Sequence, residues 1–175
     1  MKERLDKIAF FWIGSETLIP ELFVKSIRLV YGDNVEIFQL TNTVTSSVKG
    51  VSKVFRYELP EDLMMARLTA YDNFILKKGT IFYDADSLCL RKLSLRNFDE
   101  GLYFVKRTEN KVLSSKINFT NYISSKKIVI NFPEFHNKCI KEVMPYMAGC
   151  VFINEETDFF KKSKKILEKL PKRFH

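Results

Sequence analysis

Continuous apolar runs mark the strands that we expect in this chain. Residues 8–13 are apolar throughout, which is typical of a strand buried on both faces of a parallel sheet. Residues 80–83 form a second such run, so we expect the two runs to be neighbouring parallel strands in the centre of the sheet. Further strand patterns lie at residues 35–41, 51–57, 103–106, 127–131 and 150–153.

Three segments carry apolar residues at helical intervals instead. They cover residues 20–31, 60–78 and 158–170, and the first two are followed by Gly32 and Gly79, which are typical C-terminal caps. The apolar side of the last helix is expected to consist of Phe159, Phe160, Ile166, Leu167 and Leu170. Strands separated by helices of this length predict an α/β fold with an open, mostly parallel sheet flanked by helices. Ligands of such sheets bind beyond the carboxyl ends of the strands.

The composition is that of one folded domain. The 175 residues are 46% hydrophobic and 14% aromatic, which is enough to build a core. Three cysteines without C-x-x-C spacing indicate neither a disulfide framework nor a zinc cluster. The run at 8–13 is too short to span a membrane and no signal-peptide cleavage site follows it, so we expect a cytoplasmic protein.

The sharpest candidate for chemistry is the acidic pair Asp84 and Asp86, which directly follows the apolar run at 80–83. Two carboxylates at positions i and i+2 of an extended segment point the same way and repel each other unless a cation joins them. Mg²⁺ and Mn²⁺ prefer such oxygen ligands and often share them with a diphosphate. The alternative is a solvated turn in which both side chains cap backbone groups. The position at the end of a core strand favours the metal site.

The segment 67–86, in which a helix bearing Arg67 precedes a strand ending in D-x-D, resembles the donor site of GT-A-fold glycosyltransferases. Residues 146–154 are similar to a strand of the glycogenin-like members. The resemblance implies a single GT-A-like domain over 1–175, with a donor-binding part at 1–90 and an acceptor-side part at 91–175. It also implies a metal-dependent enzyme of the hexosyltransferase kind. Such an enzyme would use Mn²⁺ or Mg²⁺ to transfer a sugar from a UDP- or GDP-sugar to an unknown glycan, lipid or protein.

The same resemblance implies a role for each matched position. Asp86 would bind the metal directly, and Asp84 would reach the metal through water or contact the ribose. The other nucleotide-sugar contacts would come from Ile13, Gly14 and Ser15 at base and ribose, Thr41 and Asn42 near the base, Arg67 at the diphosphate or sugar, and Gly149 beside the sugar or acceptor. Plainer interpretations remain open for three of them: a solvated arginine, a turn glycine at 14 and a packing glycine at 149. No motif identifies a catalytic base.

The chain departs from the family after the Gly149 strand. Its two histidines, His136 and His175, match no third metal ligand, and no acidic acceptor-side motif follows. We therefore expect the acceptor-side part to be incomplete and transfer to be weak. One alternative is a catalytically weak or inactive sugar-nucleotide-binding protein. Another is a basic module, because seven basic residues fall within 161–175 of a chain with net charge +8. The helix at 161–169 would then make a peripheral contact with an anionic membrane, whereas nucleic-acid binding is not expected.

Overall fold

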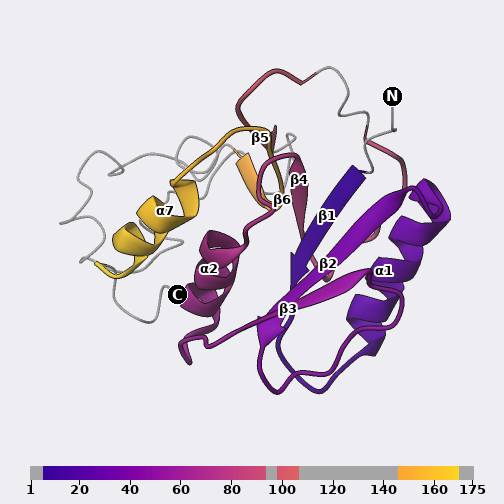
Figure 1. The fold of residues 1–175 in the computed structure, drawn as a ribbon, viewed down its shortest axis with the longest axis horizontal. Helices are drawn as coiled ribbons and strands as arrows, with labels where there is room; N and C mark the ends of the chain where they lie inside the picture. Colours follow the sequence, from indigo (N-terminus) through magenta and orange to yellow (C-terminus); the bar gives the residue numbers. More distant parts are fainter. Residues whose placement is uncertain (1–5, 94–97, 107–145, 170–175) are drawn as a thin grey trace, which may run out of the picture. The chain divides into compact units, whose positions relative to one another are not determined.

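The computed structural model describes residues 6–93, 98–106 and 146–169 (Figure 1). The chain forms two compact units, residues 1–103 with 149–175 and residues 104–148. The account below concerns the first unit, which contains both parts of the expected donor site. The single domain over 1–175 stays a prediction, and the strand expected at 127–131 and Cys139 lie outside the described residues.

Six strands form one mixed sheet in the order β3-β2-β1-β4-β6-β5. Strands β1 to β4 are parallel to their neighbours, whereas β6 is antiparallel to β4. The expected central pair is confirmed, because β1 lies beside β4 with Ile8 opposite Ile81. The strand bounds are β1 Asp6–Phe11, β2 Val35–Asn42, β3 Lys53–Tyr57, β4 Thr80–Asp84, β5 Leu102–Lys106 and β6 Tyr146–Ile153. The mostly parallel α/β architecture predicted from the apolar runs is therefore present.

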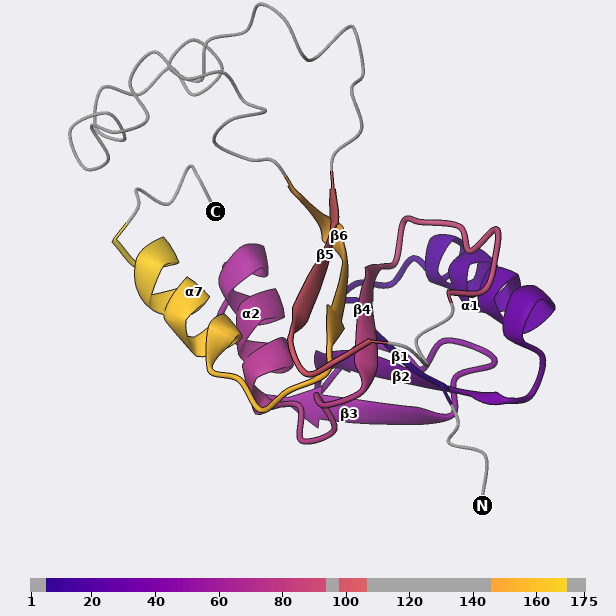
Figure 2. The same ribbon diagram turned by 90° about the horizontal axis from the view of Figure 1, so that it is seen from above.

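The helices cover both faces of this sheet (Figure 2). Helix α1 (Leu18–Tyr31) lies on one face, and helices α2 (Leu63–Asn73) and α7 (Phe159–Leu167) lie on the other. Alternate residues of β1 serve the two layers: Phe10 packs on Phe23 of α1, while Phe11 packs on Tyr71 of α2. Burial of β1 on both faces explains why its sequence is an uninterrupted apolar run.

The helix ends differ from those expected at the two prolines. Helix α1 begins at Leu18, because the carboxylate of Glu16 accepts hydrogen bonds from the first backbone N–H groups of the helix. Helix α2 begins at Leu63, because the side chain of Asp62 caps it by accepting from the N–H of Met65 at 2.9 Å. The expected end at Gly32 is confirmed, with its N–H donating to the carbonyl of Arg28.

Two apolar residues lie elsewhere than expected. Helix α2 ends at Asn73, so Ile75 falls outside it and is 80% exposed, while Phe74 leaves the helix with an extended backbone and is fully buried. Ile166 of α7 is 53% exposed and does not share the buried side of Phe160 and Leu167. Within the described ranges no helix is long and apolar enough to cross a membrane.

Candidate functional site

The candidate site lies where the strand order reverses. Strands β2 and β3 follow on one side of β1, whereas β4 returns to its other side, and the intervening helices α1 and α2 lie on opposite faces. The chain therefore diverges beyond the carboxyl ends of β1 and β4, and such divergence opens a crevice in α/β sheets. We call the side of the sheet at which β1 to β4 end the carboxyl edge, and the opposite side the amino edge.

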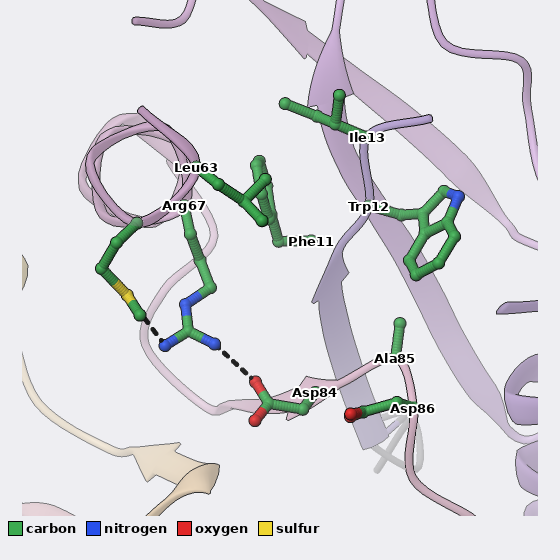
Figure 3. A pocket seen from close by; sticks show the side chains of 9 residues that line it. Phe11, Trp12, Ile13, Leu63, Arg67, Asp84, Ala85 and Asp86 are labelled. Carbon is green, nitrogen blue, oxygen red and sulfur yellow. Dashed lines mark hydrogen bonds and ion pairs between the residues drawn. The ribbon is translucent and has the colours of Figure 1, made fainter. Parts of the chain in front are cut away.

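A pocket of about 280 Å³ occupies this crevice (Figure 3). Three elements contribute to it: the end of β1 and the residues after it, the first turns of α2, and the end of β4 with the turn that follows. The lining residues are Phe11, Trp12, Ile13, Leu63, Met64, Arg67, Asp84, Ala85 and Asp86. Figure 3 shows that the charged side chains gather on one wall, while Phe11, Leu63 and Ile13 form an apolar wall facing them.

Asp84 and Arg67 form an ion pair within the pocket. Arg67 Nη1 donates to Asp84 Oδ1 at 2.9 Å, and the other terminal nitrogen of Arg67 lies 3.1 Å from the sulfur of Met64. The two side chains are only 24% and 33% exposed. Burial raises the pKa of Asp84, the guanidinium of Arg67 opposes that rise, and the neighbouring Asp86 adds to it. The pocket thus holds a carboxylate whose charge is incompletely compensated by the protein.

Gly149 of β6 lies against the same carboxylate. A methyl group built at its α-carbon would be 3.2 Å from Asp84 Oδ2, which is tighter than ordinary contact. The resemblance assigned the space at Gly149 to a sugar or an acceptor, but in this structure the Asp84 side chain lies in that space. Asp84 is therefore held between Arg67 on one side and the β6 backbone on the other.

Asp86 lies beyond the strand and not on an extended segment, which corrects the geometry expected for the D-x-D pair. Ala85 and Asp86 form a turn in which the N–H of Ser87 donates to the carbonyl of Asp84 at 3.2 Å. The turn still directs both carboxylates toward one pocket (Figure 3). Within the described part of the chain neither side chain accepts a backbone hydrogen bond, so the alternative of a pair that merely caps backbone groups is not supported.

The other predicted contacts from the first two strands build the scaffold beside the pocket. Thr41 is fully buried, and its hydroxyl donates to the carbonyl of Trp12 at 2.6 Å. The side-chain oxygen of Asn42 accepts from the N–H of Thr45 at 2.8 Å, and the Thr45 hydroxyl accepts from the N–H of Gly14. Ser15 is exposed, and of these predicted positions Ile13 alone lines the pocket. Contacts of the others with a nucleotide stay predictions.

The sequence interpretation missed the apolar lining of the pocket. Trp12 directly follows β1, while Leu63 and Met64 open α2. Asp62 was the available signal, because an aspartate three residues before the N–H that it caps marks a helix start. Starting α2 there would have placed its first turns, and hence Leu63 and Met64, at the carboxyl edge together with Arg67.

The donor atoms of the pocket suit one kind of metal. In the described ranges no group of three or more histidine, cysteine, aspartate or glutamate side chains is arranged to hold a cation. Two carboxylates in an open pocket instead match Mg²⁺ or Mn²⁺, which commonly bind one or two carboxylates and complete their shell with water and substrate phosphates. Asp86 is the exposed member of the pair, and Asp84 is engaged with Arg67.

Comparison with protein-family models and with curated proteins finds no match for this chain.

Proposed function

We propose that the pocket binds a nucleoside-diphosphate sugar together with Mn²⁺ or Mg²⁺, and that the protein is a glycosyltransferase of the GT-A type. The observation that carries this proposal is the convergence of Asp84, Asp86 and Arg67 in one pocket at the reversal point of a mostly parallel sheet. Ligand sites of α/β proteins lie at this point of the sheet, and these three side chains suit a metal-bound diphosphate.

The charges of the pocket favour this ligand class. Two carboxylates and one guanidinium leave the lining residues with a net charge of −1 when all are ionised. A divalent cation would change the sign of the site, and a diphosphate then becomes the complementary partner. The metal-free pocket, in contrast, offers a diphosphate more repulsion than attraction. Binding of the nucleotide is therefore expected to require the cation.

The chemistry of sugar transfer places charge where these groups lie. Departure of the nucleoside diphosphate from the anomeric carbon develops negative charge on its phosphate oxygens. A bound cation supplies Lewis-acid stabilisation of that charge. Arg67, on α2, is placed to add a second positive group at the same wall of the pocket. The donor is proposed to be a UDP- or GDP-sugar and the acceptor a glycan, lipid or protein, and no described residue is assigned as the base.

A thermal-shift panel of nucleotides and sugar nucleotides, each with Mn²⁺ and with EDTA, tests the proposal. Ligand at about 100 times its dissociation constant stabilises the folded state by about 2.7 kcal/mol, which for a chain of this size raises the melting temperature by about 5–10 °C. We expect such a rise for a UDP- or GDP-sugar with Mn²⁺ alone. A panel without any rise, or equal rises in EDTA, would contradict the proposed function.

A second candidate function rests on the outer face of α7, where Lys161, Lys165 and Lys169 are exposed at four-residue intervals. Two other lysines of this helix are used within the protein: Lys164 pairs with Asp72 of α2 at 3.0 Å and Lys162 pairs with Asp158. The exposed row suits the headgroups of an anionic membrane, toward which each basic residue contributes about 1 kcal/mol. The protein would then be a peripheral protein of the cytoplasmic leaflet.

Vesicle sedimentation tests this second function. The wild type is expected to bind vesicles that contain phosphatidylserine, to bind phosphatidylcholine vesicles poorly, and to be released by salt. Replacing Lys161, Lys165 and Lys169 by glutamine should abolish the binding. Replacing the paired Lys162 alone, as a control on the same helix, should weaken it less. Equal binding of both lipids would contradict this function and leave the donor site unaffected.

A further inference from the structure

Arg67 is the one cation among the nine residues that line the pocket. It lies on the second turn of α2, whose start is fixed by the Asp62 cap. One turn later Tyr71 is buried, with its ring against Phe11, Phe82 and Phe160. The backbone that carries Arg67 is thus anchored on both sides, and the guanidinium reaches Asp84 from a fixed origin.

Asp84 has little freedom to leave this guanidinium. One carboxylate oxygen accepts from Arg67 at 2.9 Å, while the other lies against the α-carbon of Gly149. The α-carbon of Asp84 is itself fixed at the end of β4, beside Phe11 of β1. Arg67 therefore serves as the internal counter-ion of the acidic pair in the structure described here.

A bare divalent cation and Arg67 compete for the same carboxylate. Metal bound at the acidic pair would lie close to a positive group that has no anionic partner other than Asp84 among the lining residues. A diphosphate removes this conflict, because its negative oxygens give both the guanidinium and the cation a partner. Each of the two ligands thereby improves the site for the other.

We propose that Arg67 makes the binding of cation and diphosphate mutually dependent, so that the pocket takes up a metal–diphosphate complex and does not keep a resident metal. This inference rests on the proposed function and specifies the form in which its ligand enters. By linkage, the factor by which diphosphate tightens metal binding equals the factor by which metal tightens diphosphate binding. Arg67 is a positioning residue in this account, and removing it has opposite effects on the two ligand forms.

Trp12 provides a direct measurement, because it is the single tryptophan of the chain and lines this pocket. Paramagnetic Mn²⁺ bound at the acidic pair is expected to quench its fluorescence. The titrants are Mn²⁺ alone and the preformed complex of Mn²⁺ with inorganic pyrophosphate. The proteins are the wild type, Arg67→Gln, Arg67→Lys and Arg91→Gln. The last is a matched charge control near the amino edge, since its neighbour Lys92 pairs with Asp6 at the start of β1.

Wild type is expected to bind the complex at least about tenfold more tightly than Mn²⁺ alone, within the usual range of coupling between ligands. Arg67→Gln should bind Mn²⁺ alone more tightly than wild type and the complex more weakly. Arg67→Lys, which keeps the charge, and Arg91→Gln should preserve the preference for the complex. If Arg67→Gln leaves both affinities unchanged, or weakens both alike, the inference is overturned while the donor site stands. If no protein binds either titrant, both the inference and the proposed function fail.

Discussion

At the scale of single residues, Asp84 combines a structural cost with a chemical use. It lies half-buried between Arg67 and Gly149, two residues from a second carboxylate. Burial raises its pKa although Arg67 opposes the rise. A group that is ionised against the preference of its surroundings destabilises the fold and is favoured by an added cation, which is the usual compromise at a binding site.

The pH dependence of stability tests this view of Asp84. Because its pKa in the folded state lies above that in the unfolded state, its ionisation lowers the free energy of unfolding as pH rises through the folded pKa. Asp84→Asn removes this penalty. We therefore expect the variant to exceed wild type in unfolding free energy at neutral pH in EDTA, and the advantage to shrink on acidification.

Urea unfolding of both proteins at several pH values between about 4 and 7 measures the difference. Asp33→Asn, an exposed change at the amino edge, serves as the control and should follow wild type. A lower stability of Asp84→Asn that is the same at every pH would show that the Arg67 pair outweighs the cost of burial.

Residue types at a strand end predicted part of this site and missed another part. The acidic pair stood out because charged residues directly follow a buried strand, and Arg67 because it lies on the preceding helix. The partners of Thr41 and Gly149 were not predictable, because they depend on which atoms meet across strands far apart in sequence. Thr41 meets the Trp12 carbonyl and Gly149 meets Asp84.

At the scale of elements, β4 connects the core to the pocket. Phe82 lies two residues before Asp84 and contacts the rings of Tyr71, Phe74 and Phe160, so it joins β4 to α2 and α7. The strand was predictable because burial on both faces requires an apolar run. The start of α2 was not, because the Asp62 cap overrode the signal from Pro60.

Truncation of Phe82 is expected to be costly. Phe82→Ala should lower the free energy of unfolding by about 3–5 kcal/mol, since it removes a fully packed ring and leaves a cavity between the sheet and two helices. Leu90→Ala, at a position that is 86% exposed, should change it by less than about 0.5 kcal/mol. Urea denaturation compares the two variants. A loss below about 1 kcal/mol for Phe82→Ala would contradict the packing described for β4.

At the scale of the whole described unit, the pocket follows from how the chain crosses the sheet. Apolar runs predicted two central parallel strands and the position of the acidic pair at the carboxyl edge, and both are present. The antiparallel β6 beside β4 was not predicted, since an apolar run specifies burial and not direction. That strand brings Gly149 to Asp84 and thereby contributes to the site from a distant part of the sequence.

Calorimetric titration of UDP- and GDP-sugars tests the central claim most directly. The titrated proteins are the wild type, Asp86→Asn and the control Asp33→Asn, each with Mn²⁺ and with EDTA. Asp86 is the exposed carboxylate of the pocket, so its loss should remove the cation with little effect on the fold. The account predicts that wild type and Asp33→Asn bind one of these donors in Mn²⁺ alone, and that Asp86→Asn binds it at least about tenfold more weakly. Equal affinity of wild type and Asp86→Asn, or binding that EDTA does not change, would contradict it.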